Sequence, residues 1–237
     1  MMRIAMWSGP RNLSTAMMYA FAQRPDCAVW DEPFYAAYLK MTGLDHPMRD
    51  AILAAGETDP AQVAAACAGQ IPQGQSLFYQ KHMAQHMVPD MPLDWAHRVT
   101  NVFLIRHPAR VIASYAQKRQ APVEADLGFC RLAELCDRLG GADPIVIDSA
   151  DIRRDPAGML EKLCTRLGIG FDPAMTRWPA GGNPADGIWA PHWYGAIHAS
   201  TGFAGEEGPL PDLSGAYLGL VEEAMPHYAR MADLRMR

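Results

Sequence analysis

The apolar residues of the chain fall in short runs, separated by longer segments with helical periodicity. Five runs are continuous rather than alternating in their apolarity: Arg3–Trp7, Cys27–Trp30, Leu77–His82, Val99–Ile105 and Pro144–Ile147. Continuous apolarity is typical of parallel strands covered on both faces. Because these runs alternate with helical segments, we expect an α/β fold with a parallel sheet of about five strands and helices on both faces.

The helical segments are defined by their apolar spacing and by their end signals. Pro108 lies at a first turn, and Asp155 is placed as a helix cap. The segment 41–75 is rich in Ala and Gln and predicts a small cap of helices and loops over one sheet edge. No repeat or linker divides the chain, so we predict one domain over 1–237. The expected long helices are Ser14–Gln23, Pro108–Arg119, Leu127–Leu139, Pro156–Leu167 and Leu213–Met231.

The segment 178–205 differs from the rest because it combines many Gly and Pro residues with several aromatic ones. Its composition excludes long regular elements. A loop this aromatic is expected to cover a ligand, although Trp178 is at least as well explained as ordinary core.

Composition and charge narrow the possible partners. The chain has 237 residues, of which 49% are hydrophobic and 20% are charged, and this composition argues against a disordered chain. Its net charge of −5 argues against a general binding surface for nucleic acid or for anionic membranes. Any bound anion must therefore be held by local groups. The 5 cysteines are scattered without a C-x-x-C pair, and we expect reduced thiols. No signal-peptide or membrane-spanning pattern is found, so we predict a cytoplasmic protein.

The stretch "SGPRNLST", residues 8–15, joins the first strand to the first helix. Such a loop directs backbone N–H groups and the positive end of the helix dipole at one point, which predicts an anion site. Against the nucleotide-binding pattern G-x-x-x-x-G-K-[ST], Ser14 stands where lysine belongs and Thr15 supplies the hydroxyl. Arg11 offers a bidentate anion clamp. The alternative is an ordinary helix cap by Ser14 beside a surface arginine.

A second strand, loop and helix occurs in "VTNVFLIRHPARVIASY", residues 99–115. Arg106 follows the strand, at the sheet edge where ligands of open α/β sheets bind, and Ser114 lies eight positions later. The alternative is that Arg106 pairs with Asp31 or Glu32, while Ser114 faces a neighbouring helix.

Together, "GPRNLST" and "IRHPARVIAS" resemble the two donor-binding motifs of the sulfotransferase family, whose sulfuryl donor is 3′-phosphoadenosine 5′-phosphosulfate (PAPS). The resemblance covers the N-terminal half well and is weaker beyond residue 150. It implies a P-loop-type α/β fold in which the first motif holds the phosphosulfate and the second holds the 3′-phosphate. The donor-binding residues that it implies are Gly9, Pro10, Arg11, Asn12, Leu13, Ser14, Thr15, Arg106 and Ser114. Trp189 of the aromatic segment is added as a further donor-binding candidate.

The resemblance also suggests a general base. Hydroxyl-sulfating members carry Lys-x-His on the strand corresponding to "QKH", where this chain has adjacent Lys81 and His82. His82 takes the histidine's place, although a core histidine satisfied by a carboxylate is the alternative. Glu32 in "WDEPFY" is the rival base, unless Asp31 and Glu32 merely neutralise an arginine. A zinc site on His82 and His86 lacks an evident third ligand.

These elements lead to a specific expectation. Arg11, Ser14, Thr15 and the loop N–H groups hold the phosphosulfate and stabilise the leaving phosphate without a metal, and His82 or Glu32 takes the acceptor's proton. Lys81 is a further catalytic candidate, although its register is shifted from that of the family's lysine. The aromatic segment stacks on adenine or closes over the acceptor. The acceptor is expected to be a small molecule with a hydroxyl or amine. The alternatives are a P-loop kinase or NTPase, a non-catalytic nucleotide-binding module, and a pyridoxal-phosphate enzyme, for which no lysine context is evident.

Overall fold

Five parallel strands form the centre of the molecule, in the order β2-β3-β1-β4-β5. The structure is a computed structural model that describes residues 1–119 and 121–236, so residues 120 and 237 of the predicted domain lie outside the described part. The α/β prediction is confirmed, and every strand ends within one residue of its predicted bounds. The strands are β1 (Met2–Ser8), β2 (Cys27–Asp31), β3 (Leu77–Met83), β4 (Thr100–Ile105) and β5 (Ile145–Asp148).

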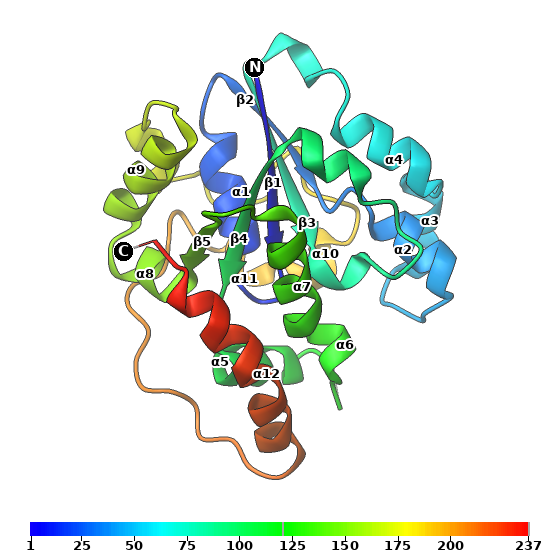
Figure 1. Cartoon of the computed structure of the whole chain (residues 1–237), viewed down its shortest axis with the longest axis vertical. Helices are drawn as coiled ribbons and strands as arrows, with labels where there is room; N and C mark the ends of the chain where they lie inside the picture. Colours follow the sequence, from blue (N-terminus) through cyan, green and yellow to red (C-terminus); the bar gives the residue numbers. More distant parts are fainter. Residues whose placement is uncertain (120, 237) are drawn as a thin grey trace.

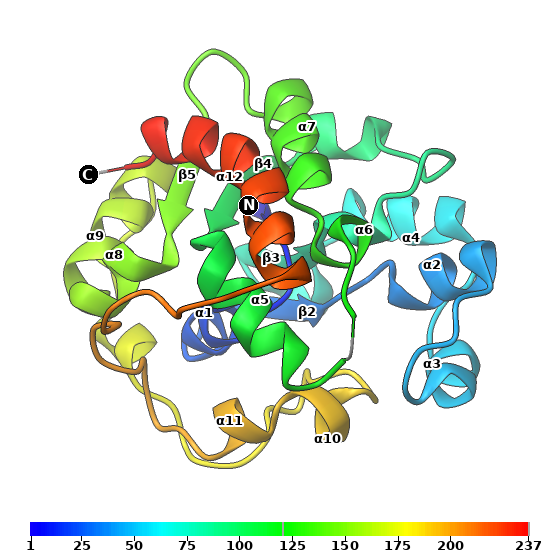
Figure 2. The ribbon, with the colours of Figure 1, turned by 90° about the horizontal axis from the view of Figure 1, so that it is seen from below.

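Helices cover both faces of the sheet, as Figures 1 and 2 show. Alternate strand residues point to opposite faces, so Ile4 and Met6 pack in one apolar cluster while Ala5 and Trp7 pack in the other. The Ile4 face carries α1 (Ser14–Ala22), α8 (Ser149–Arg154) and α9 (Pro156–Leu167). The Trp7 face carries α2 (Tyr35–Thr42), α4 (Pro60–Cys67) and α7 (Phe129–Leu139).

The predicted cap consists of α3 (Arg49–Ala55), which packs on α2, together with α4. These helices group at the side of the molecule that carries β2 (Figure 2). None of the helices in the described ranges is both long and apolar enough to cross a membrane. The structure also has four short 3₁₀ helices: η1 (Pro72–Gly74), η2 (Ala84–His86), η3 (Asp94–Arg98) and η4 (Pro173–Thr176).

A third apolar cluster joins α5 (Pro108–Ala116), α6 (Glu124–Leu127) and α12 (Ala216–Asp233). The predicted helix over Leu127–Leu139 is interrupted at Gly128, whose φ of 68° ends α6 and precedes α7. In the aromatic segment, only α10 (Ala190–Trp193) and α11 (Gly195–His198) form, and both are short as its composition predicts.

The strand order places a crevice between β1 and β4. The chain leaves β1 for β2 on one side of the sheet and leaves β4 for β5 on the other. In open α/β sheets, such a divergence creates a binding crevice at the carboxyl ends of the two strands. Both arginine-bearing motifs follow these two strands, so the topology brings them together.

Candidate active site

The loop after β1 adopts a strained conformation that aims its N–H groups outward. Arg11 and Leu13 have positive φ values of 61° and 69°, which cost about 1–3 kcal/mol each for such residues. Met17 N donates to Leu13 O at 3.0 Å, but within the described residues the backbone N–H groups of 11–16 donate to no protein acceptor. The loop therefore presents an array of free donors at the positive end of α1, as the sequence predicts.

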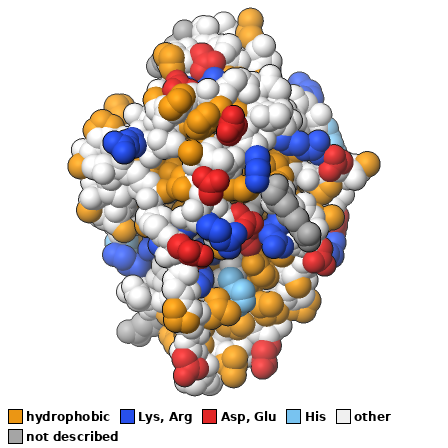
Figure 3. Space-filling view, turned by 90° about the vertical axis from the view of Figure 1, so that its left-hand side faces the viewer, with side chains coloured by type: hydrophobic (Ala, Val, Ile, Leu, Met, Phe, Trp, Pro, Cys, Tyr) orange, Lys and Arg blue, Asp and Glu red, His pale blue; other side chains and the backbone are white. Residues whose placement is uncertain are grey.

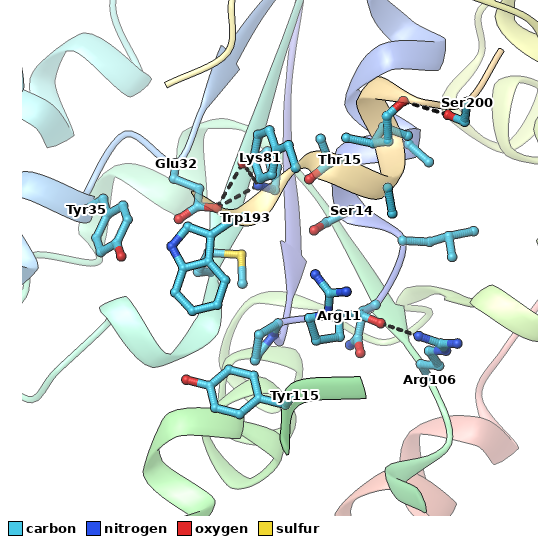
Figure 4. Close-up of a pocket in the computed structure, with 18 of the residues that line it drawn as sticks. Arg11, Ser14, Thr15, Glu32, Tyr35, Lys81, Arg106, Tyr115, Trp193 and Ser200 are labelled. Carbon is cyan, nitrogen blue, oxygen red and sulfur yellow. Dashed lines mark hydrogen bonds and ion pairs between the residues drawn. The ribbon is translucent and has the colours of Figure 1, made fainter. Parts of the chain in front are cut away.

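The residue that precedes α1 is Leu13, and Ser14 is the first residue of the helix. The alternative of a cap by Ser14 is thus not observed. The Ser14 and Thr15 hydroxyls line a cavity in front of the loop and have no hydrogen-bond partner among the described side chains. Figure 4 shows both residues beside Arg11 at this cavity.

The two arginine motifs contact each other directly. Arg11 Nε donates to Ser114 Oγ at 2.9 Å, and Arg106 Nη1 donates to Arg11 O at 2.7 Å. Burial and the charge of Arg106 lower the pKa of Arg11. Arg106 pairs with Glu207 and not with Asp31 or Glu32, the partners of the simpler alternative.

The opposite side of the cavity is built on the ends of β2 and β3. Lys81 Nζ lies 2.9 Å from Asp31 Oδ1, 2.6 Å from Glu32 Oε1 and 2.5 Å from the Tyr194 hydroxyl. Tyr194 donates to Asp31 Oδ2 at 2.8 Å, and Gly187 N donates to the same oxygen at 3.1 Å. The two carboxylates therefore neutralise Lys81 rather than an arginine.

This buried cluster has one more carboxylate than ammonium. Burial raises the pKa of Asp31, and the neighbouring Glu32 charge adds to the effect against the attraction of Lys81. Burial opposes the charge of Lys81, but attraction to Asp31 and Glu32 outweighs it and raises the pKa of Lys81. Lys81 is thus a fixed cation that contacts both carboxylates.

Glu32 is the carboxylate of this cluster that reaches the cavity. Its backbone φ is 42°, a left-handed conformation that is strained for glutamate. Oε1 is held by Lys81, whereas Oε2 lies 3.9 Å from His86 Nε2. Glu32 and Lys81 line the cavity (Figure 4), whereas Asp31 is not among the residues that line it.

His82, the predicted base, lies on the other face of β3 and is not among the residues that line the cavity. Strand alternation puts Lys81 on one face and His82 on the other. His82 stacks on Trp7 at 4.6 Å between ring centroids, lies 5.0 Å from Trp95, and bonds to Gln80 Oε1 at 3.1 Å. Burial lowers the pKa of His82 to about 3. It is a core histidine satisfied by an amide rather than by a carboxylate.

The cavity measures about 340 Å³ and joins the loop after β1 to the Glu32 side. Its remaining wall is aromatic: Tyr35, Tyr115 and Trp193 surround the space in Figure 4. His86 also lines it, and burial lowers the pKa of His86 well below its usual value. Within the described ranges, no group of three His, Cys, Asp or Glu side chains is placed to hold a metal ion.

Three of the predicted donor-binding residues, Gly9, Ser114 and Trp189, do not line the cavity. Trp189 packs in the core and donates from Nε1 to Tyr194 OH at 3.1 Å, while Trp193 takes the cavity position. Gly9 faces residue 127, since a Cβ added there would lie 2.5 Å from Leu127 O. Trp178 is ordinary core, with 4% of its surface exposed.

Sequence reasoning missed Tyr194 and Glu207, which contact Lys81 and Arg106. Tyr194 lies within the aromatic segment that is expected to cover a ligand, so the composition pointed to its segment but not to the residue itself. No local pattern marks Glu207.

A family model described as "Sulfotransferase domain" matches residues 2–235. The chain therefore belongs to the sulfotransferase-domain family. It is 37% and 35% identical to branched-chain-amino-acid aminotransferase-like proteins 1 and 2 of Arabidopsis thaliana, over 94% of this chain in each case. The chain spans only 40% of the length of these relatives, so their names describe much longer proteins.

Solved structures of similar architecture include the sulfotransferase domain from the Synechococcus PCC 7002 olefin synthase. It has a TM-score of 0.48 and 17% identity, and the match covers 93% of each chain. The sulfotransferase domain from the curacin biosynthetic pathway has a TM-score of 0.49 and 14% identity, covering 94% of this chain and 96% of that one.

Proposed function

We propose that this chain transfers the sulfuryl group of PAPS to a hydroxyl or amine of a small-molecule acceptor. The observation that carries the proposal is the pairing, across one cavity, of an anion-binding loop with a buried carboxylate. Free N–H groups and the Arg11 guanidinium face the cavity from one side, and Glu32 faces it from the other. Membership of the sulfotransferase-domain family supports the same chemistry.

In this proposal, the loop after β1 holds the 5′-phosphosulfate. The N–H groups of 11–16 and the Ser14 and Thr15 hydroxyls bind its oxygens, and Arg11 stabilises the negative charge that develops on the leaving phosphate. Arg106, which donates to Arg11 O, is proposed to bind the 3′-phosphate, the group that distinguishes PAPS from ATP.

Glu32 is proposed as the general base in place of His82. The acceptor oxygen or nitrogen forms a bond to sulfur, the bond from sulfur to the phosphate oxygen breaks, and the acceptor's proton passes to Glu32 Oε2. Lys81 holds Oε1 at 2.6 Å and thereby fixes the direction of the second oxygen. The aromatic wall of Tyr35, Tyr115 and Trp193 is proposed to position the acceptor.

Ligand binding and turnover test the proposal together. Adenosine 3′,5′-bisphosphate should raise the thermal midpoint more than adenosine 5′-phosphate or ATP with Mg²⁺ at equal concentration, because a ligand that binds the folded state more tightly stabilises it more. Incubation with PAPS and a panel of small alcohols, phenols and amines should release adenosine 3′,5′-bisphosphate. Stabilisation by ATP with Mg²⁺ but not by the bisphosphate contradicts the proposal and favours a kinase or NTPase.

A further inference from the structure

Glu207 lies at the centre of three arginines beside the candidate active site. Its Oε1 accepts from Arg106 Nε at 3.1 Å and from Arg153 Nη1 at 2.8 Å, and its Oε2 lies 3.0 Å from Arg110 Nε. Only 4% of the Glu207 side chain is exposed, whereas 14–19% of each arginine side chain is exposed. One carboxylate is therefore enclosed by three guanidinium groups, which come from the residue that follows β4, from α5 and from α8.

The charges of this cluster do not balance. Three cations face one anion, so two positive charges remain in a chain whose net charge is −5. A phosphate monoester carries about two negative charges at neutral pH and offers three oxygens, which match forked guanidinium donors better than one carboxylate does. The cluster is thus better suited to a phosphate group than to its present occupant.

The segment that delivers Glu207 is held mainly by the same arginines. Residues 203–214, which we call the strap, contain no helix or strand, and within the described residues no backbone N–H of the strap donates to a backbone carbonyl. Arg153 Nε donates to Gly205 O at 2.7 Å, and Arg110 Nη2 donates to Gly208 O. A segment with so few other bonds opens at low free-energy cost.

The strap connects this cluster to the cavity. Phe203 and Ala204 line the cavity, and Arg106 also donates to Arg11 O in the loop after β1. Figure 3 shows acidic and basic side chains intermixed on the face that it draws. Glu207 differs from exposed carboxylates such as Glu206 in being buried.

We propose that Glu207 is an internal competitor for a ligand phosphate, which must displace it from Arg106, Arg110 and Arg153. The inference rests on the proposed function, because we identify this ligand phosphate as the 3′-phosphate of the sulfuryl donor. When the phosphate enters, the guanidinium donors exchange one carboxylate for phosphate oxygens, and the strap loses its anchors. The free energy needed to displace Glu207 lowers the affinity of the protein for the donor. It lowers the affinity only for ligands that carry a phosphate at this position.

The test compares Glu207→Gln with the neighbouring control Glu206→Gln by isothermal titration. Glu206 is 69% exposed and lies 3.6 Å from Arg154, outside the cluster. We expect Glu207→Gln to bind adenosine 3′,5′-bisphosphate and inorganic phosphate at least tenfold more tightly than the wild type, with adenosine 5′-phosphate unchanged. Glu206→Gln should match the wild type for all three. Unchanged or weaker binding of both adenosine 3′,5′-bisphosphate and inorganic phosphate by Glu207→Gln overturns the inference.

A second measurement uses the wild-type protein, because three unneutralised arginines can impair folding of the variant. Cleavage of the strap by a protease that cuts after glutamate should become faster when adenosine 3′,5′-bisphosphate binds, because the released segment becomes accessible. Binding of the bisphosphate with unchanged or slower cleavage of the strap overturns the inference.

The two proposals fail in different ways. If no variant binds the bisphosphate but Glu207→Gln gains affinity for inorganic phosphate, the proposed function fails and the competition stands. If PAPS turns over and Glu207→Gln gains no affinity, only the competition fails.

Discussion

Arg11 Nε donates to Ser114 Oγ at 2.9 Å, and the two residues are 103 positions apart in the chain. The family resemblance places them at opposite ends of the donor, with Arg11 on the phosphosulfate and Ser114 on the 3′-phosphate. In the structure, the serine instead orients the arginine. The hydroxyl fixes the guanidinium at Nε, which leaves the two terminal nitrogens to face the cavity.

Ser114→Ala tests which of these roles the serine has. We expect the variant to bind adenosine 5′-phosphate and adenosine 3′,5′-bisphosphate more weakly by the same factor, about 3–10-fold, because one hydrogen bond contributes about 0.5–1.5 kcal/mol. Titration calorimetry with both nucleotides measures this. A loss confined to the bisphosphate would show that Ser114 contacts the 3′-phosphate directly. Ser76→Ala, on an exposed residue, is the control.

Replacing Glu32 with glutamine tests the proposed base. Glu32→Gln should slow release of adenosine 3′,5′-bisphosphate from PAPS by about 10²–10⁴-fold, since the proton acceptor is lost. Bisphosphate affinity should stay within about twofold, because the loop after β1 is untouched. Steady-state turnover and titration calorimetry give the two quantities. Full turnover by Glu32→Gln would remove this residue from the mechanism.

Lys81 is expected to be essential for stability. Lys81→Met leaves Asp31 and Glu32 buried without their cation, and breaking such a pair costs about 3–5 kcal/mol. Urea unfolding should show this loss as a lower midpoint with an unchanged slope. The control is Lys162→Met on the exposed side of α9, where a change below about 0.5 kcal/mol is expected. Equal midpoints for the two variants would contradict the buried pairing.

Gly9 is required by packing rather than by a ligand. A Cβ at this position would lie 2.5 Å from Leu127 O, so Gly9→Ala forces the loop or α6 to shift. We expect a loss of about 1–3 kcal/mol in the free energy of unfolding, as for other overpacked sites. Gly205→Ala, with no atom within 4 Å of its added Cβ, is the matched control. Stability equal to that of the wild type in Gly9→Ala would refute the close contact.

The sheet and the loop after β1 were predictable because their signals are local. A buried apolar run, a short loop and a helix form one contiguous stretch, and strand order then follows from few alternatives. The face of β3 was not predictable in the same way. Both faces of a central strand are buried, so apolarity does not tell which of Lys81 and His82 points to the cavity.

Glu207 shows a different limit. It meets Arg106 across 101 residues, from a segment without helix or strand. No periodicity links such a segment to the sheet, and the pairing depends on how the strap crosses α5 and α8. Trp189 and Trp193 show the same limit at shorter range, because the turn of α10 decides which indole faces the cavity.

The buried His82 is expected to make the stability of the protein depend on pH. Burial lowers the pKa of His82 to about 3 in the folded protein, below its unfolded value of 6.5. The unfolded chain therefore binds the proton first, and the stability contributed by neutral His82 is complete above pH 6.5 and is lost as the pH falls toward 3. One such group contributes up to about 1.4 kcal/mol per pH unit in this window.

His82→Phe keeps an aromatic ring against Trp7 and Trp95 but removes the titrating group. We expect the free energy of unfolding of the variant to fall less steeply than that of the wild type between pH 6.5 and 4, when both are measured by urea unfolding. His97→Phe, on an exposed histidine, should follow the wild-type slope. Because His82 lies away from the cavity, the variant should also retain turnover within a few-fold. Loss of turnover with donor binding intact would return His82 to the mechanism, and an unchanged slope would show that burial does not set its protonation.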